Sequence, residues 1–283
     1  MQRRDYRLAH AGLDFHVTEW GSPQGLPVVM LHGIRGYAET FAGIAAALQP
    51  EYRVIAFDQR GRGRTDWDAD CNYYTDTYVA DLAAVADQLS LARFDLLGHS
   101  MGGINAIVYA ARHPGRVGRL VVEDAGPGAF EDSDGARRIR RELAETRPAS
   151  PPGTPPATSC GRCAPACPSR LGSSARKHAQ ARAEGGYVWR YDHAGIARTR
   201  LHPDPRAWWT WRLRRAHRLS DPAAARRPLR LPATGHGRTH ARPQPRIEAV
   251  EIADAGHYIH DDQPAAFARH VCRFLKPHAP AGA

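Results

Sequence analysis

The sequence predicts an α/β fold in which a mostly parallel central sheet is flanked by helices. Short apolar runs alternate along the chain with segments of helical spacing, and this alternation is typical of parallel strands joined by right-handed crossovers. Residues 27–33 form one such run, which is apolar throughout and ends at a glycine, as a buried parallel strand does where it enters a loop. A chain of 283 residues is long enough for one large domain of this class with a small insertion.

The expected elements can be placed in order along the chain. Alternating polar and apolar residues over 6–20 predict an N-terminal hairpin. Further strands are expected at residues 27–33, 52–58, 94–98, 119–124 and 247–252. Helices are expected at residues 40–48, 77–89, 103–112 and 264–275. In the second of these helices the spacing places Asp81 and Asp87 on the outer face.

The composition bounds the class of protein. No run of about eighteen apolar residues occurs, so no membrane-spanning helix is expected. The first residues lead into a mixed polar stretch rather than an apolar segment, so no secretory signal is expected. An odd number of cysteines, five, favours reduced thiols, and we predict a cytoplasmic protein.

The positive charge of the chain is unevenly distributed. A formal net charge of +10 ordinarily indicates a nucleic-acid partner. Residues 147–186 carry a net +5 and residues 212–245 a net +8, which leaves the rest of the chain at −3. Because the basic residues do not belong to the body of the predicted fold, we predict a small-molecule substrate, no nucleic-acid partner and no membrane partner.

The two basic tracts also lack the residues that build a core. The only large apolar residue of 147–186 is Leu171, and 212–245 holds four leucines but no aromatic or β-branched aliphatic residue. Burial of so little apolar area cannot offset the conformational entropy that the chain loses on folding. We therefore expect neither tract to supply a strand or a packed helix face.

Two interpretations of the tracts are open. In the first interpretation, the tracts are a flexible linker and a basic loop. In the second, they result from two compensated frameshifts, or from equivalent sequencing errors, in a GC-rich gene. The second hypothesis rests on the abrupt return of well-patterned sequence at Tyr187 and Arg246. The alternative reading frames of the coding DNA distinguish the two.

A Gly-x-Ser-x-Gly pattern occupies residues 98–102, between a short apolar strand and an alanine-rich helix. This strand–turn–helix context is that of a nucleophile elbow, in which a serine with a strained backbone stands at the start of a helix. Bulky side chains two residues to either side would collide at such a turn, which explains the glycines. The helix dipole and free N–H groups there favour negative charge. Ser100 is therefore the predicted nucleophile.

With this elbow the chain resembles the α/β-hydrolase superfamily, in its esterase, lactonase and C–C hydrolase branch. Family motifs are matched by residues 31–34, by the Asp-x-Arg-Gly-x-Gly loop at 58–66, and by residues 98–103 and 254–257. The resemblance covers residues 10–145, 187–211 and 246–275. It implies a hydrolase core at residues 1–130 and 246–283. A degraded cap is implied at residues 131–211, and this cap contains the first basic tract, 147–186. The second basic tract, 212–245, stands in place of the penultimate strand region.

The resemblance implies a role for each matched residue. Ser100 attacks the substrate carbonyl, and His257, which lies between a strand and the last helix, is the general base. The backbone N–H groups of Ile34 and Met101 form the oxyanion hole. His260 is the nearest rival of His257 and is expected at the surface. No cofactor and no metal ion is implied.

The acid that orients the histidine has several candidates. Most relatives carry it after the penultimate strand, but residues 227–232 contain no carboxylate. A minority, the haloalkane dehalogenases among them, place it after the strand that follows the nucleophile helix, which favours Glu123. The rivals are Asp221 and Asp124, and Asp124 could equally be a structural residue that closes the strand. The remaining alternative is that the chain has no functional acid. Because loss of this acid costs on the order of 10⁴ in turnover, we predict reduced or negligible activity.

Two further signals have a structural interpretation. Cys160, Cys163 and Cys167 have a spacing that resembles a metal site, but they lie in the first basic tract and no strand or turn frames them. The basic loop 60–64 resembles a phosphate or nucleic-acid patch, but in the family this loop is structural and flanks the active site.

The sequence therefore predicts a serine hydrolase of carboxylic esters, lactones or related carbonyl compounds, which works by acyl transfer through a serine, a histidine and an acid. The alternative is a catalytically inactive protein of the same fold, which is either a binding module or a damaged gene product.

Overall fold

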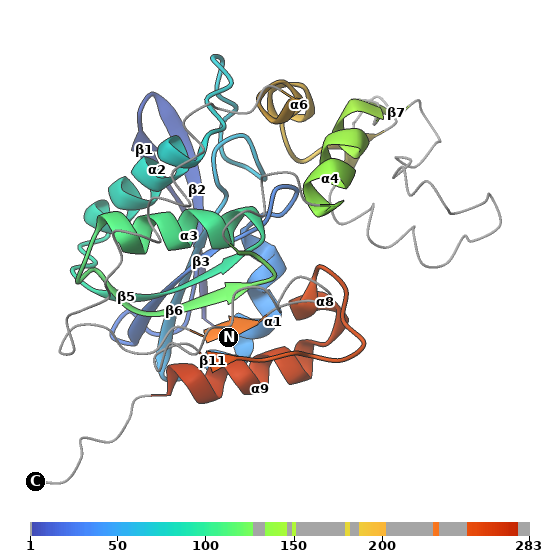
Figure 1. The fold of residues 1–283 in the computed structure, drawn as a ribbon. Coiled ribbons are helices and arrows are strands. Elements are labelled where there is room, and N and C mark those ends of the chain that lie inside the picture. The colour runs from blue at the N-terminus through green and yellow to red at the C-terminus, as the bar shows by residue number, and fades with distance from the viewer. Residues whose placement is uncertain are drawn as a thin grey trace, which may run out of the picture.

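The computed structural model describes residues 2–126, 134–145, 149–150, 179–181, 187–201, 229–231 and 248–276. In these residues an eight-stranded sheet has the order β1-β2-β4-β3-β5-β6-β10-β11 (Figure 1). The strands are β1 (Arg3–His10), β2 (Leu13–Trp20), β3 (Leu26–Leu31), β4 (Tyr52–Phe57), β5 (Phe94–His99), β6 (Val117–Glu123), β10 (Leu229–Leu231) and β11 (Glu248–Ala249). β2 pairs antiparallel with β1 and β4, and the other pairings of this sheet are parallel. The predicted α/β class with a mostly parallel sheet is confirmed.

Helices cover both faces of the sheet (Figure 1). On one face lie α2 (Thr75–Gln88) and α3 (Met101–Arg112), and on the other lie α1 (Ala42–Leu48) and α9 (Pro264–Leu275). A 3-10 turn, Ala38–Phe41, precedes α1, and a single helical turn, α8 (Ile259–Asp262), precedes α9.

The alternation of side chains along β3 explains the two core layers. Val28 and Met30 pack into the layer that contains α1 and α9, whereas Val29 and Leu31 pack into the layer of α2 and α3. Successive residues of a strand point to opposite faces, so a continuous apolar run is needed when both faces are covered.

A smaller unit lies beyond one end of the sheet. It consists of α4 (Asp134–Glu145), α6 (His193–Leu201) and a three-stranded antiparallel sheet of β7 (Ala149–Ser150), β9 (Tyr187–Trp189) and β8 (Ala179–Ala181). α4 and α6 lie side by side (Figure 1). Buried side chains of this unit pack against the main domain in one apolar cluster, made of Leu143, Trp189, Tyr191, Ile196, Ile34, Tyr73, Tyr78 and Met101.

The expectation that neither basic tract supplies a strand is wrong. β7 and β8 fall in the first tract, and β10 falls in the second. β10 pairs in parallel with both β6 and β11 and so occupies the penultimate position of the sheet. Strand pairing uses backbone N–H and C=O groups, which a tract poor in apolar side chains still provides. The rest of the two tracts lies outside the described residues.

Within the described part of the expected strand 247–252, which begins at residue 248, only Glu248–Ala249 pairs with a neighbouring strand. Of the helices, 264–275 was predicted with the bounds that α9 has. Among the helices that the structure describes, none has the length and apolar character needed to cross a membrane.

Candidate active site

Ser100 lies in a tight turn between β5 and α3. Its backbone is strained, with φ 53° and ψ −118°, a conformation that costs free energy and concentrates at functional sites. A Cβ atom at Gly98 would lie 2.3 Å from the carbonyl oxygen of Gly102, and one at Gly102 would lie 2.1 Å from that of Leu31. Both glycines are therefore required by close backbone approach.

His257 lies beside this serine. It belongs to the loop between β11 and α8, and its Nε2 is 2.9 Å from Ser100 Oγ. Ser100 is buried, with 8% of its surface exposed. A proton on Nδ1 leaves Nε2 free to accept the serine hydroxyl hydrogen, as a general base must.

Asp124 is the carboxylate that contacts His257. Its Oδ2 lies 2.5 Å from Nδ1 of the histidine, so it accepts the Nδ1 hydrogen and selects the tautomer that the serine needs. Asp124 directly follows β6 and has a left-handed φ of 43°. Serine, histidine and aspartate thus form one hydrogen-bonded chain.

The prediction of Glu123 as the orienting acid is therefore corrected. Glu123 is fully buried, and its carboxylate accepts from Nδ1 of His260 at 2.8 Å and from the backbone N–H of His260 at 2.9 Å. β6 ends at Glu123, and the backbone at Asp124 has a left-handed φ of 43°. The two consecutive carboxylates therefore point in different directions, and Asp124 is the one that reaches His257. Asp221, the other rival, lies outside the described residues.

His260, expected at the surface, is only 8% exposed. Its Nδ1 and backbone N–H both face Glu123. A buried histidine must be hydrogen-bonded, and a buried carboxylate must be paired. The spacing of three residues between His257 and His260 places one on each of the two adjacent carboxylates.

The loop after β3 lies against the serine. A Cβ at Gly33 would be 3.3 Å from Ser100 Cβ and 2.8 Å from Nδ1 of His99. Ile34 follows this glycine and Met101 follows Ser100, and both are buried in the same apolar cluster. The structure thus brings together the two residues whose N–H groups were predicted to form an oxyanion hole.

Buried polar side chains fix this loop. His32 accepts from the backbone N–H of Gln59 through Nε2 at 2.9 Å, and its Nδ1 contacts the Gly33 carbonyl at 2.8 Å. The Gln59 amide donates to the His32 carbonyl and accepts from Asn105. These bonds attach the loop to the strand end after β4 and to α3.

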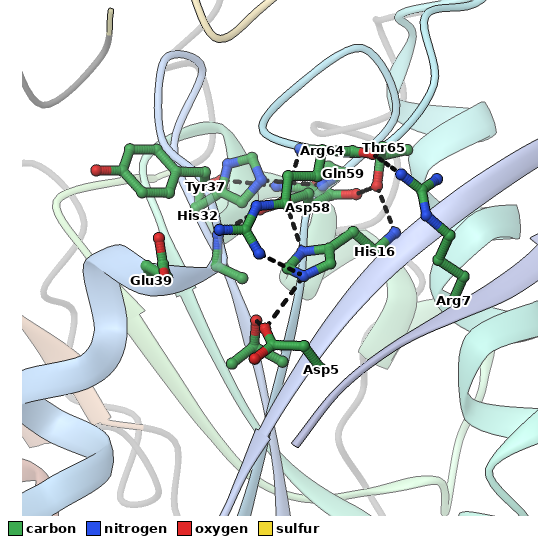
Figure 2. Close-up of polar contacts among 12 residues, drawn as sticks. Asp5, Arg7, His16, His32, Tyr37, Glu39, Asp58, Gln59, Arg64 and Thr65 are labelled. Carbon is green, nitrogen blue, oxygen red and sulfur yellow. Dashed lines mark hydrogen bonds and ion pairs between the residues drawn. The ribbon is translucent and has the colours of Figure 1, made fainter. Parts of the chain in front are cut away.

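Next to Gln59, Asp58 anchors the start of the loop 58–66 (Figure 2). Its carboxylate accepts from the backbone N–H groups of Ala38 and Arg64, and it faces Nδ1 of His16 at 2.9 Å. Figure 2 shows His16 between Asp58 and Asp5. Burial alone would raise the pKa of Asp58, but its hydrogen bonds and the neighbouring histidines lower it below the usual range.

Arg62 lies behind the predicted oxyanion hole and has no exposed surface. Its Nε donates to the Ile34 carbonyl at 3.1 Å, and a terminal nitrogen is 3.5 Å from the sulfur of Met101. The guanidinium also donates to the Arg60 carbonyl and to the Tyr78 hydroxyl. One buried cation therefore touches both residues of the predicted hole.

The basic loop 60–64 is structural, as expected, because two of its arginines point inward. Arg60 forms a bidentate contact with Asp81, at 2.7 and 2.6 Å, and a further contact with Asp68. The expectation that Asp81 lies on the outer face of its helix is consequently wrong. Its carboxylate is 1% exposed because it pairs with a buried guanidinium.

His99 is the site residue whose contacts the sequence did not indicate. It precedes Ser100, its Nε2 donates to the His257 carbonyl at 2.8 Å, and the two rings lie 4.9 Å apart. Burial lowers the pKa of His99 to about 3, so it stays neutral near pH 7. The one sequence signal for His99 is its position within the Gly-x-Ser-x-Gly pattern, next to Ser100.

The profile of the alpha/beta hydrolase fold family matches residues 27–193. The chain belongs to this family. Members of its fold place their site at the carboxyl ends of parallel strands, and Ile34, Ser100 and Asp124 follow β3, β5 and β6 respectively. A hollow of about 350 Å³ lies at the opposite ends of the same strands, against Phe94 and Gly118, and is not part of this site.

Among its relatives in sequence, the non-heme chloroperoxidase of Streptomyces lividans is 39% identical over 125 residues, which are 44% of this chain and 45% of that protein. The 2-hydroxy-6-oxo-2,4-heptadienoate hydrolase of Pseudomonas putida is 36% identical over 127 residues, again 44% of this chain and 45% of that protein. The chain spans about half the length of the curated relatives it matches.

Solved structures resemble this alpha/beta hydrolase over nearly its full length. E-2-(acetamidomethylene)succinate hydrolase has a TM-score of 0.75 at 22% identity, covering 97% of this chain and 99% of that one. An esterase from a marine microorganism has a TM-score of 0.71 at 23% identity, covering 92% of this chain and 99% of that one. Likeness at these identities concerns the fold.

Two sequence expectations fall outside the described residues. They are the metal-like spacing of Cys160, Cys163 and Cys167 and the candidate acid Asp221. Among the residues that the structure does describe, one group has the types that ligate metals, namely His99, Glu123 and His260.

Proposed function

We propose that this chain is a serine hydrolase that acts on carboxylic esters, lactones or related carbonyl compounds. The observation that carries the proposal is the hydrogen-bonded chain from Ser100 Oγ through His257 to Asp124, with distances of 2.9 and 2.5 Å. A serine is activated for attack when an adjacent base accepts its proton and a third group orients that base.

The reaction proceeds in two halves. Ser100 Oγ attacks the carbonyl carbon while Nε2 of His257 takes the hydroxyl proton, and the carbonyl electron pair moves onto the oxygen. Collapse of this tetrahedral intermediate expels the alcohol, which receives the proton from His257, and leaves an acyl ester on Ser100. Water then attacks the acyl carbon with His257 again as base. The bond to Ser100 Oγ breaks, Oγ takes the proton back from His257, and the carboxylic acid is released.

Negative charge on the tetrahedral oxygen needs donors that are already in place. The backbone N–H groups of Ile34 and Met101 serve this role, and Arg62 holds the loop of one and contacts the side chain of the other. Fixed donors cost no reorganisation during the reaction and are worth several kcal/mol, about 3 for a single donor.

The expectation of impaired activity rested on the lack of an orienting acid. The contact of the Asp124 carboxylate with Nδ1 of His257 supports Asp124 as that acid. We therefore expect turnover at an ordinary hydrolase rate, with a median near 10 s⁻¹ among enzymes, rather than a residual rate.

Steady-state hydrolysis of p-nitrophenyl esters tests this proposal. The wild type and Asp87→Asn should turn over alike, since Asp87 forms only an exposed pair with Arg116 on the far side of α2. Ser100→Ala should lose activity to the level of buffer. If the wild type is no faster than Ser100→Ala, the chain is the inactive alternative, a binding module or a damaged product.

A further inference from the structure

A second histidine–carboxylate pair lies directly behind the proposed catalytic one. Glu123 and Asp124 are consecutive, and they contact His260 and His257, which are three residues apart in the other segment. The Glu123–His260 pair is the more buried of the two, since these side chains are 0% and 4% exposed against 17% and 26% for Asp124 and His257. This buried pair is not part of the hydrogen-bonded chain of Ser100, His257 and Asp124 and needs another explanation.

We propose that Glu123, His260 and His99 form a positioning cluster that holds the loop of the general base in place. The proposal rests on the function proposed above, because it concerns how His257 is kept within reach of Ser100. None of the three side chains contacts the reacting atoms, so each is a positioning residue.

The Glu123 carboxylate fixes the end of the loop at α8. It accepts two hydrogen bonds from one residue, the Nδ1–H and the backbone N–H of His260. Burial by itself raises the pKa of Glu123, but the nearby His260 and His99 and these hydrogen bonds lower it below its usual value. The group is therefore an ionised acceptor, and charge-assisted bonds are the stronger ones.

His99 fixes the middle of the loop. Its Nε2–H donates to the carbonyl of His257 itself, and its ring lies 4.9 Å from the ring of His257 and 5.0 Å from that of His260. Because His99 is neutral, it brings no positive charge close to the imidazolium that forms on His257 during attack. Its peptide neighbour is Ser100, so one residue connects nucleophile and base.

The loop needs such support because the strand before it is short. β11 has two residues, and the backbone then passes through Asp254 with a left-handed φ of 56° and the exposed Gly256. The contacts from Glu123, Asp124 and His99 tie three points of this loop to the ends of β5 and β6. Misplacement of a catalytic group by about 1 Å can cost about 100-fold in rate.

The same three side chains have the types of a zinc site, with ligand atoms within 4.8 Å of one another. The contacts favour a hydrogen-bonded cluster instead. Both Glu123 oxygens face the Nδ1 of His260, at 2.8 and 2.9 Å, and the His99 Nε2–H is used by a carbonyl. Coordination through His99 Nε2 or His260 Nδ1 would break these bonds.

The test combines kinetics with a measurement that does not need activity. Glu123→Gln keeps the shape of the side chain but removes its charge, and it should lower kcat for a p-nitrophenyl ester about 10- to 100-fold with little change in KM. Amide hydrogen exchange of residues 254–262 should become faster in the same variant. Glu248→Gln, which removes an exposed pair with Arg273, is the matched control and should change neither.

His99 gives a graded version of this test. Glutamine at position 99 retains an N–H donor for the His257 carbonyl, whereas leucine does not, so kcat should fall in the order wild type, His99→Gln, His99→Leu. If Glu123→Gln does not fold, His260→Gln replaces it with the same expected result. Unchanged kcat and unchanged exchange in the folded variants would overturn the proposal.

The failure of this proposal can be told apart from failure of the proposed function. If the wild type does not hydrolyse esters, exchange of 254–262 still decides whether the cluster holds the loop. Metal analysis of the purified wild type completes the test: the positioning cluster predicts no stoichiometric metal and no effect of EDTA on turnover. One bound metal per chain, with turnover lost on chelation, would overturn it.

Discussion

Asp124 and Glu123 are neighbours in the chain but hold different histidines. Asp124 Oδ2 lies 2.5 Å from Nδ1 of His257, and Glu123 Oε1 lies 2.8 Å from Nδ1 of His260. β6 ends at Glu123, and the backbone turns at Asp124, which has a left-handed φ of 43°. One carboxylate thus faces the proposed catalytic histidine, and the other faces the loop that carries it.

This relationship predicts a ranking of two isosteric substitutions. Asp124→Asn should lower kcat on the order of 10⁴-fold, because the amide favours the wrong tautomer of His257. Glu123→Gln should cost about 100-fold or less, because it disturbs only the position of the loop. Steady-state kinetics of both variants check the order. A larger loss in Glu123→Gln would restore Glu123 as the orienting acid.

The close packing of the elbow predicts a cost for any side chain at Gly102. Gly102→Ala places a Cβ about 2 Å from a backbone oxygen of β3, and such overpacking should lower the free energy of unfolding by about 3 kcal/mol or more. Gly43→Ala is the matched control. Its Cβ would meet nothing within 4 Å on α1, so it should raise the free energy of unfolding by about 0.4 to 1 kcal/mol. Urea denaturation measures both.

Arg62 should matter to both stability and activity. Arg62→Met removes the donor to the carbonyls of Ile34 and Arg60, at about 1 to 3 kcal/mol for each carbonyl left unsatisfied. It also frees the loop of the proposed oxyanion hole, so kcat should fall. Arg64→Met, at an exposed position of the same loop, should change both much less. Equal effects of the two variants would contradict a role for the buried cation.

His99 predicts a pH dependence of stability. Unfolded histidine binds a proton below its ordinary pKa of 6.5, whereas folded His99 does so only near 3. The unfolded state therefore takes up more protons as the pH falls from 6.5 toward 3, and stability present above pH 6.5 is lost by up to about 1.4 kcal/mol per pH unit. His99→Gln should show a shallower slope in denaturation between pH 5 and 6.5. An unchanged slope would show that His99 is protonated in the folded state.

Much of the fold was predictable because its signals are local. The continuous run that became β3 and the periodic segment that became α9 follow directly from hydrophobic spacing, with Pro264 at the first turn marking the start of the helix. The elbow around Ser100 was predictable because glycines at fixed spacing have one steric explanation there. These elements needed no knowledge of their neighbours.

The remainder depends on contacts between distant residues. Whether Glu123 or Asp124 reaches His257 is decided by one backbone angle at the end of β6, which no pattern reports. Asp81 was placed outside by helical spacing, but a buried guanidinium 21 residues earlier in the chain pairs with it. β10 was missed because its pairing depends on the backbone of β6 rather than on its own composition.

The origin of the two basic tracts stays a prediction. If they arose by compensated frameshifts, an alternative frame of the coding DNA over 147–186 and 212–245 should encode apolar periodicity and an aspartate after the penultimate strand. Resequencing the gene tests this directly. Absence of such a pattern in either alternative frame would leave the tracts as a genuine linker and loop.

The proposed function requires Ser100 to be an activated nucleophile. Intact-mass spectrometry after incubation with a fluorophosphonate measures this most directly, because the reagent adds covalently only to a serine with a working base. The account predicts one adduct on the wild type, mapped to Ser100, none on Ser100→Ala, and much slower labelling of Asp124→Asn. A wild-type chain that remains unlabelled, while folded, would contradict it.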